Sequence, residues 1–353
     1  MKRSGPQTRA VAGPAAPGPG AAPPPPDPAR DPGRTERGPG RGAGATRPRL
    51  GFRHRLQRTD ASVSPYLYVA PFFLLFLGFM LFPLGYTFYV SLNDWNLIGA
   101  EARSFTGLEN YRTLLADPNF WNALRNTFSI WLLSTVPQLL LALGLAHLLN
   151  ARLRGKTLFR MGVLVPNVAS LVAVTIIFAQ LFGRDFGLIN WLLGLAGVGP
   201  IDWQAGTASS HIAIAVMVVW RWTGYHALIY LAAMQAIPRE LYEAASLDGA
   251  GSFQMLRSIT IPALRPVIIF SVLISTIYGM QIFAEPLLFD PKPGSVTGGA
   301  GRQFQTLTVY LYEQGFREFD FGYAATIGWV MFLLVVAVAL VNYALTRRIS
   351  STR

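Results

Sequence analysis

The sequence predicts an all-α membrane protein with six transmembrane helices and both termini in the cytoplasm. Of its 353 residues, 52% are hydrophobic and only 14% are charged, whereas a soluble domain carries about 25% charged residues. Six apolar stretches are each long enough to cross a bilayer, which takes about 20 residues. Basic residues collect between alternate pairs of these stretches, which indicates the orientation.

Residues 1–60 are predicted to be a disordered, basic cytoplasmic tail before a transmembrane domain over 61–350. Residues 1–58 hold 12 Lys and Arg against 3 acidic residues, and they are rich in Pro, Gly and Ala. A segment with so few large apolar residues cannot bury enough surface to fold. Its arginines contact anionic lipid, or the tail is a solvated extension that helps to orient the first span. Because most of the net charge of +12 lies in this tail, it does not argue for a nucleic-acid partner.

The apolar stretches define the predicted spans, in which internal prolines are tolerated because neighbouring helices satisfy the freed backbone groups. These spans are residues 66–92, 125–149, 161–182, 211–235, 267–288 and 323–346. With the amino terminus inside, the inner segments beyond the tail hold ten basic residues, and the outer segments hold seven when Arg125, at the outer edge of the second span, is included. Both termini and the 236–266 loop are therefore predicted to be cytoplasmic. Between the spans, Tyr111–Trp121 is predicted to be an amphipathic stretch and 186–193 a short interfacial helix.

The loop over 236–266 carries the most specific pattern in the chain. Its elements are Glu243-Ala244-Ala245, Asp248-Gly249-Ala250, Ile261-Pro262 and Pro266. Gly249 and Gly251 allow a tight turn where a side chain would clash. We expect a helix over 239–248, this turn, and a second helix with an apolar stripe that runs to Pro262. Two short amphipathic helices on the cytoplasmic side offer a surface that a soluble partner can bind.

This pattern resembles the EAA loop of permease subunits in ATP-driven, binding-protein-dependent importers. The likeness covers roughly residues 62–350, and within it Phe105–Tyr111, Gly187–Leu193, Ala236–Ala250 and Thr306–Ala324 look like carbohydrate permeases of the maltose and lactose type. The resemblance implies the permease fold of ATP-binding cassette (ABC) importers in a bacterial inner membrane. It also implies that residues 239–262 dock on an ATPase subunit. The coupling positions would be Glu243, Ala244, Ala245, Asp248, Gly249 and Pro262.

The same resemblance implies the partners of the chain. They would be a second homologous permease subunit, two ATP-binding cassette subunits, an extracytoplasmic sugar-binding protein, and a sugar or oligosaccharide as substrate. We expect this chain to bind no cofactor, since the partner subunits would hydrolyse the ATP. The sequence names neither the sugar nor the ATPase.

We expect no catalytic or metal site, and the chain is not predicted to be an enzyme. It has no cysteine, which excludes disulfides, zinc-thiolate sites and thiol catalysis. Gly155-Lys156-Thr157 is similar to the end of a phosphate-binding loop, but Asn150 stands where that motif needs its first glycine. We interpret this segment as a basic loop on the inner side of the membrane.

Polar and aromatic residues inside the spans mark a predicted substrate pathway. Ionisable side chains at membrane depth suggest function, and Arg221 lies mid-span while Glu285 lies late in the fifth span. Rings with a few amide and hydroxyl groups suit a sugar. The predicted pathway residues are Trp222, Tyr225, Tyr278, Gln281 and Glu285, the last three sharing one helical face. The alternative for these residues is that they pack between helices. For Arg221 and Glu285, the alternative is a structural ion pair. His226 is expected to be a packing residue.

Two other classes of membrane protein fit the sequence less well. An ion-gradient-driven secondary transporter would show internal repeats and coupling-ion sites near the bilayer midplane. The chain shows no repeat, and Glu285 is the only carboxylate within the predicted spans. A membrane enzyme would show clustered Asp, His or metal-ligand spacing near an interface, which the sequence lacks.

Overall fold

The fold is described from a computed structural model of the chain. The structure describes residues 66–97, 104–151, 154–290, 292 and 294–350, and only the helical backbone for 345–350. Almost all of these residues belong to the unit Val69–Arg353, whose internal arrangement is given below. The predicted tail over 1–60 lies outside the described residues.

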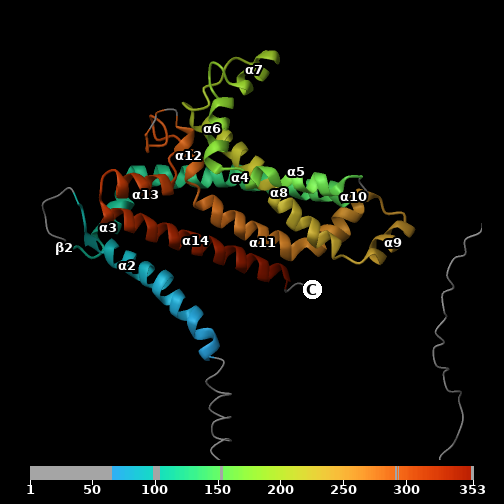
Figure 1. Cartoon of the computed structure of the whole chain (residues 1–353), viewed down its shortest axis with the longest axis horizontal. Coiled ribbons are helices and arrows are strands. Elements are labelled where there is room, and N and C mark those ends of the chain that lie inside the picture. Colours follow the sequence, from blue (N-terminus) through green and yellow to red (C-terminus); the bar gives the residue numbers. More distant parts are fainter. Residues whose placement is uncertain (1–65, 98–103, 152–153, 291, 293, 351–353) are drawn as a thin grey trace, which may run out of the picture. The chain divides into compact units, whose positions relative to one another are not determined.

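Within the described residues, five helices are long and apolar enough to cross a membrane. They are Tyr66–Ser91, which includes η1 (Leu77–Leu81) and α2 (Phe82–Ser91); α4 (Pro118–Asn150); α8 (Thr207–Gln235); Ser252–Met280; and Phe321–Ala344 within α14 (Phe321–Ser350). Figure 1 shows α4, α8, α11 (Ile261–Met280) and α14 running alongside one another. This architecture confirms the predicted all-α membrane fold. The cytoplasmic placement of the termini stays a prediction.

The third predicted span, 161–182, is bent rather than straight. It corresponds to α5 (Lys156–Val168) and α6 (Leu171–Leu181), whose axes meet at 88°. The backbone turns extended at Ala169 and Ser170, which ends one helix and starts the next. The two residues are small and apolar or weakly polar, so the hydropathy of the stretch does not reveal the bend. The pair counts as one broken span or as a re-entrant segment.

The fifth long helix begins earlier and ends earlier than the predicted span 267–288. It runs from the predicted cytoplasmic loop as α10 (Ser252–Met255), η2 (Leu256–Thr260) and α11, and it ends at Met280. Pro262 therefore does not end a loop helix. The π-helical turn η2 directly precedes this proline, which lacks an N–H and would disturb an ordinary α-helical turn.

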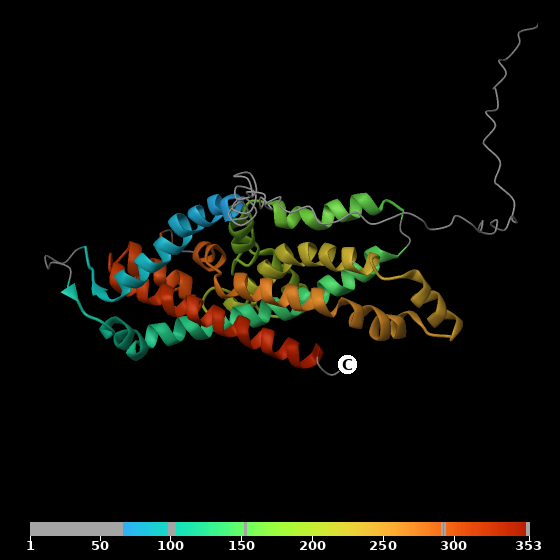
Figure 2. The same cartoon turned by 90° about the horizontal axis from the view of Figure 1, so that it is seen from below.

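The long helices pack through small side chains. Ala142 and Ala146 of α4 are fully buried against a cluster that includes Ala227 and Tyr230 of α8. Small residues let membrane helices approach closely. Gly224 is the tightest case, because a Cβ atom there would lie 1.8 Å from the carbonyl oxygen of Val163 in α5. Figure 2 shows α5 beside α8.

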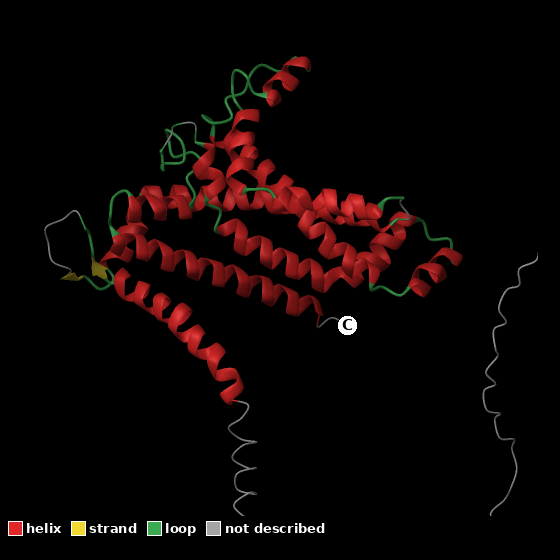
Figure 3. Ribbon diagram, viewed as in Figure 1, coloured by secondary structure: helices red, strands yellow, loops and turns green. Residues whose placement is uncertain are grey.

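Shorter elements complete the fold. These are β1 (Asn93–Asp94), which pairs antiparallel with β2 (Ser104–Phe105), and the helices α3 (Glu109–Ala116), α7 (Leu188–Leu195), α9 (Arg239–Leu247), α12 (Ala284–Phe289) and α13 (Leu307–Phe316). Figure 3 shows how small the strands are beside the helices. The predicted helix over 186–193 is present as α7. The predicted stretch Tyr111–Trp121 is instead divided at Asp117, where the backbone is extended. The Asp117 side chain caps α4 by accepting a hydrogen bond from the Asn119 amide at 2.8 Å.

Candidate functional site

The turn between α9 and α10 depends on Gly249. The residue has φ of 80°, a left-handed conformation that glycine adopts without a steric penalty. The Ala250 amide donates to the Ala245 carbonyl at 2.9 Å, and the Gly249 amide donates to Ser246 at 3.1 Å. These two bonds form the usual glycine-terminated helix end. The predicted order of helix, glycine turn and helix is thus present.

The surface of α9 and its turn is mostly exposed within the described part of the chain. No side chain of α9 is buried, and Leu247 is 89% exposed while Phe253 of α10 is 75% exposed. The coupling positions Glu243, Asp248 and Gly249 are also exposed. The contact that holds α9 is a 2.9 Å hydrogen bond between the hydroxyls of Tyr242 and Thr260. Figure 2 shows α9 beyond the ends of α8 and α11.

A cavity of about 450 Å³ lies between α4, α8, α11 and the segment 281–285. Four of the predicted pathway residues line it, namely Trp222, Tyr278, Gln281 and Glu285. Tyr225 is not among the lining residues, and its ring instead packs edge-on against Trp222 with centroids 5.7 Å apart. The rings of Trp222 and Tyr278 lie 4.9 Å apart and form one aromatic wall of the cavity.

Glu285 lines this cavity, but the backbone that places it there differs from the continuous helix that the sequence predicts. Tyr278, Gln281 and Glu285 do not share a helical face, because α11 ends at Met280 and Gln281 is its C-terminal cap. The backbone is non-helical from Gln281 to Phe283, and a short helix, α12, begins at Ala284. This change of direction returns Glu285 to the cavity, where its side chain is only 7% exposed.

The sequence interpretation missed the polar residues that α4 contributes. Ser134, Thr135 and Gln138 all line the cavity. The Gln138 Nε2 donates to the Ser275 hydroxyl at 3.2 Å, and that hydroxyl lies 3.0 Å from the Nε2 of His226. The chain of contacts links α4, α11 and α8. Part of its signal was available in the sequence, since Ser134 and Gln138 are polar residues one turn apart in a mostly apolar span.

His226 lines the cavity rather than only packing between helices. Its Nδ1 atom is buried and has no hydrogen-bond partner among the described residues. Val218, also in the lining, is apolar. The amide groups of the cavity lining come from Gln138 on α4 and from Gln281 at the end of α11, and none comes from α8.

Arg221 and Glu285 are the two charged residues of the cavity lining. They interact electrostatically, but no ion pair joins them in the part of the chain that the structure describes, where the ion pairs are Arg184–Asp202 and Arg302–Glu313. The Nε atom of Arg221 is buried without a hydrogen-bond partner. The ion pair weighed as an alternative from the sequence is therefore not formed as a direct contact.

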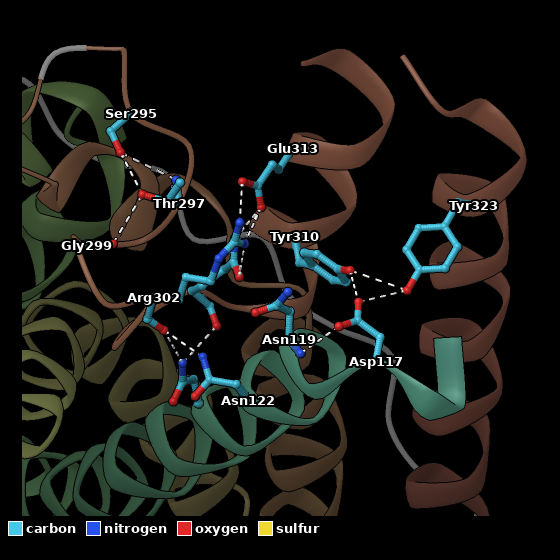
Figure 4. Close-up of polar contacts among 12 residues, drawn as sticks. Asp117, Asn119, Asn122, Ser295, Thr297, Gly299, Arg302, Tyr310, Glu313 and Tyr323 are labelled. Atoms are coloured by element: carbon cyan, nitrogen blue, oxygen red, sulfur yellow. Dashed lines mark hydrogen bonds and ion pairs between the residues drawn. The ribbon is translucent and has the colours of Figure 1, made fainter. Parts of the chain in front are cut away.

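A second polar cluster fixes the loop before α13. We call Asn126, Arg302, Gln305 and Glu313 the loop network. Arg302 donates to both carboxylate oxygens of Glu313, at 2.6 and 3.0 Å, and Gln305 donates to the same carboxylate at 2.7 Å. The Asn126 amide group donates to the backbone carbonyls of residues 302 and 305, at 2.9 and 3.1 Å. Figure 4 shows Arg302 of the loop in contact with Glu313 of α13.

Asp117 joins α4 to α13 and α14. Its carboxylate accepts hydrogen bonds from the phenol of Tyr310 and, at 2.9 Å, from the phenol of Tyr323 (Figure 4). Burial, followed by the hydrogen bond to Asp117, raises the pKa of the Tyr310 phenol well above its ordinary value. Tyr310 therefore remains a neutral donor, and the three helices are held together at one carboxylate.

The loop and the cavity share a wall. The hydroxyl of Thr306 donates to the Ile282 carbonyl at 2.9 Å, and Ile282 lines the cavity. The rings of Phe289 and Phe304 pack with centroids 5.6 Å apart. The segment 281–289 that carries Glu285 is therefore held in place by the loop.

Comparison with known proteins places this architecture in a family. Residues 114–351 match the family model described as binding-protein-dependent transport system inner membrane component. The lactose transport system permease protein LacF of Rhizobium radiobacter is 37% identical over 288 residues, which cover 81% of this chain and 94% of that protein. The trehalose/maltose transport system permease protein MalF of Thermococcus litoralis is 32% identical over 287 residues, covering 81% of this chain and 94% of that protein.

The fold is shared with a solved structure. A bacterial ABC transporter involved in the import of the acidic polysaccharide alginate matches with a TM-score of 0.70 at 21% identity, over 85% of this chain and 100% of the matched chain. The relatives are transport permeases and not enzymes. From the sequence match over most of its transmembrane domain, we conclude that this chain belongs to the binding-protein-dependent transport system inner membrane components, among the permeases of carbohydrate ABC importers.

Proposed function

We propose that this chain forms half of the sugar pathway of an ATP-driven importer in a bacterial inner membrane. A homologous permease would form the other half, and an extracytoplasmic sugar-binding protein would deliver the substrate. Two ATPase subunits would dock on the α9–α10 turn at the cytoplasmic side. ATP would be bound and hydrolysed by those subunits, with no cofactor bound by this chain. Family membership supports each of these roles.

The observation that carries the proposal is the continuity between the α9–α10 turn and the cavity. The helix Ser252–Met280 begins at the turn and runs without interruption to Ser275 and Tyr278. The hydroxyl contact of Tyr242 with Thr260 fixes α9 on this helix. A partner that moves α9 as a rigid body would therefore move a wall of the cavity, because a helix transmits displacement along its axis.

The cavity has the composition of a sugar site. Its volume of about 450 Å³ lies in the range of small-molecule pockets, roughly 300–1,000 Å³. The aromatic wall of Trp222 and Tyr278 suits the C–H faces of a sugar ring, and Gln138 offers an amide for its hydroxyls. Relatives named for lactose, arabinooligosaccharides and trehalose/maltose support a saccharide substrate.

Co-purification of the tagged chain with its partners tests the docking role. We expect Glu243→Lys and Gly249→Asp each to lose the ATPase subunits while retaining the second permease. Glu243 is exposed, so its charge reversal changes the docking surface and removes no buried group. Gly249→Asp also strains the left-handed turn. Glu109→Lys, at an exposed carboxylate of α3, is the matched control and should retain every partner.

The wild-type chain provides the decisive result. If no ATPase co-purifies with it under gentle detergent conditions, the pump assignment fails, and ion-gradient-driven transport becomes the hypothesis to test. If the ATPase co-purifies but both loop variants retain it, the docking surface lies elsewhere on the chain.

A further inference from the structure

The cavity carries one cation and one anion that face the same space without touching. Arg221 comes from the middle of α8, and Glu285 comes from α12. Each lines the cavity, and no ion pair joins these two described residues. Because Arg221 and Glu285 are the lining residues that carry formal charges, the two charges of the cavity wall cancel.

Each of the two charged groups keeps hydrogen-bonding capacity that the described residues do not use. The Arg221 Nε is buried without a partner. The donor that reaches the Glu285 carboxylate among the described residues is its own backbone amide. Glu285 is only 7% exposed, and a buried charge without partners is costly. Both groups therefore have hydrogen-bonding capacity that a ligand can use.

From this arrangement we propose that Arg221 and Glu285 together make the cavity selective for uncharged saccharides. The inference rests on the proposed role of the cavity in sugar passage and specifies its substrate class. A hydroxyl both donates and accepts, so a sugar with two neighbouring hydroxyls can donate to Glu285 and accept from Arg221. Hydrogen bonds to charged partners are the strong ones, and a neutral sugar gains both of them at once.

Charged sugars gain only one of these two contacts and are opposed at the other. A uronate carboxylate would pair with Arg221 but would lie near Glu285, and an amino sugar would pair with Glu285 but lie near Arg221. Like charges at close range in a site disfavour the wrong partner. The remaining polar lining fits the same conclusion, because the amide of Gln138 and the hydroxyl of Ser275 are neutral and form hydrogen bonds with hydroxyls in either direction.

The test is ligand binding to the purified full-length chain in lipid nanodiscs. Glucose, glucuronate and glucosamine share one ring and are neutral, anionic and cationic, and saturation-transfer NMR detects weak binding of each. For the wild type we expect glucose to bind at least about tenfold better than either charged sugar, since opposed charges discriminate strongly. A wild-type preference for glucuronate or glucosamine, equal binding of all three, or binding of none would overturn the proposal.

Two conservative variants give the reciprocal signature that a merely structural role would not produce. Glu285→Gln should raise glucuronate binding above that of glucose, because Arg221 is then unopposed. Arg221→Gln should raise glucosamine binding in the same way. Glu318→Gln, an exposed carboxylate of the 317–320 segment, should keep the wild-type order. If the two cavity variants fold, as judged by their unfolding temperatures, and leave the order unchanged, the charge pair does not set specificity.

Failure here is distinct from failure of the proposed function. Co-purification of the ATPase depends on α9 and its turn and does not involve Arg221 or Glu285. A chain that retains its ATPase but shows no preference for neutral sugars would remain an importer subunit with another basis for specificity.

Discussion

Glu313 and Glu285 are both buried carboxylates, but they differ in the number of side chains that donate hydrogen bonds to them. Glu313 accepts three hydrogen bonds from Arg302 and Gln305. Glu285 is equally buried, but among the described residues no side chain donates to it, and Arg221 stops short of a direct ion pair. The same residue type is thus satisfied in the loop network and left open in the cavity.

The difference separates a structural role from a functional one. Buried polar groups in proteins are almost always hydrogen-bonded, so each exception calls for an explanation. In the loop network the donors and acceptors are matched within the protein, which fixes the loop on α4. In the cavity, Arg221 and His226 retain buried nitrogen atoms without partners. Open groups that converge on one cavity indicate a place for a ligand.

The largest expected effect comes from breaking the loop network. Glu313→Ala removes the shared acceptor and leaves the partly buried guanidinium of Arg302 without its anionic partner, although its hydrogen bond to the Gln305 Oε1 remains. Removal of one member of a buried ion pair destabilises a protein by about 3 kcal/mol or more. We expect this loss in the free energy of unfolding, measured by denaturant titration in detergent. The exposed neighbour Glu318→Ala should change it by less than about 0.5 kcal/mol.

The contrast would break if Glu313→Ala and Glu318→Ala had equal stability. Arg302 would then have to find another acceptor, and the loop would not depend on its ion pair. Glu313 would then not be a carboxylate whose hydrogen bonds stabilise the fold.

A change in the cavity should affect transport rather than folding. Gln281→Ala removes an exposed amide at the end of α11 that lines the cavity, so it costs little buried surface. We expect sugar uptake to slow several-fold, about 1 kcal/mol for one hydrogen bond to a ligand, at a normal protein level in the membrane. Uptake of labelled sugar by cells, with immunoblotting of the membrane fraction, measures both quantities.

The matched control is Gln180→Ala in α6, an exposed amide outside the cavity lining. Its uptake should equal that of the wild type. Normal uptake by Gln281→Ala at a normal protein level would remove this side chain from the pathway.

The sequence predicts well what depends on local pattern. The length of apolar runs is a property of consecutive residues, so four of the five long helices lie close to their predicted spans, and the fifth overlaps its span but begins earlier. The α9 helix and its glycine turn are also local, since Gly249 alone supplies the left-handed residue. Trp222 and Tyr278 were found because aromatic residues within an apolar span stand out.

Features set by distant contacts could not be predicted in this way. The end of α11 at Met280 and the return of Glu285 involve contacts such as that of Thr306 with Ile282, which are 24 residues apart. The hydrogen bond between Gln138 and Ser275 joins residues that are 137 positions apart. The bend between α5 and α6 leaves hydropathy unchanged. Such features follow from tertiary packing, which overrides local preference.

The smallest expected effect concerns Asp320, a half-buried carboxylate near the loop network. Its Oδ1 accepts from the Tyr323 amide at 2.9 Å and caps α14. Burial, with a further contribution from the charge of Asp94, raises the pKa of the Asp320 carboxyl above its ordinary value. A carboxyl whose pKa is higher in the folded than in the unfolded state contributes stability at low pH and loses it as pH rises through the folded pKa.

Asp320→Asn keeps an oxygen acceptor for the cap and removes the charge, so it isolates this titration. The wild type should become less stable relative to Asp320→Asn as pH rises from below the unfolded carboxyl pKa, about 3.9, through the raised value. At the lowest pH both side chains are neutral, and the remaining difference measures the cap alone. The unfolding free energies of the two proteins, measured across this pH range, give the change of their stability difference with pH. A wild type that gains relative stability with rising pH would mean that Asp320, like Glu313, is satisfied as an anion, and the contrast between carboxylates would then rest on Glu285 alone.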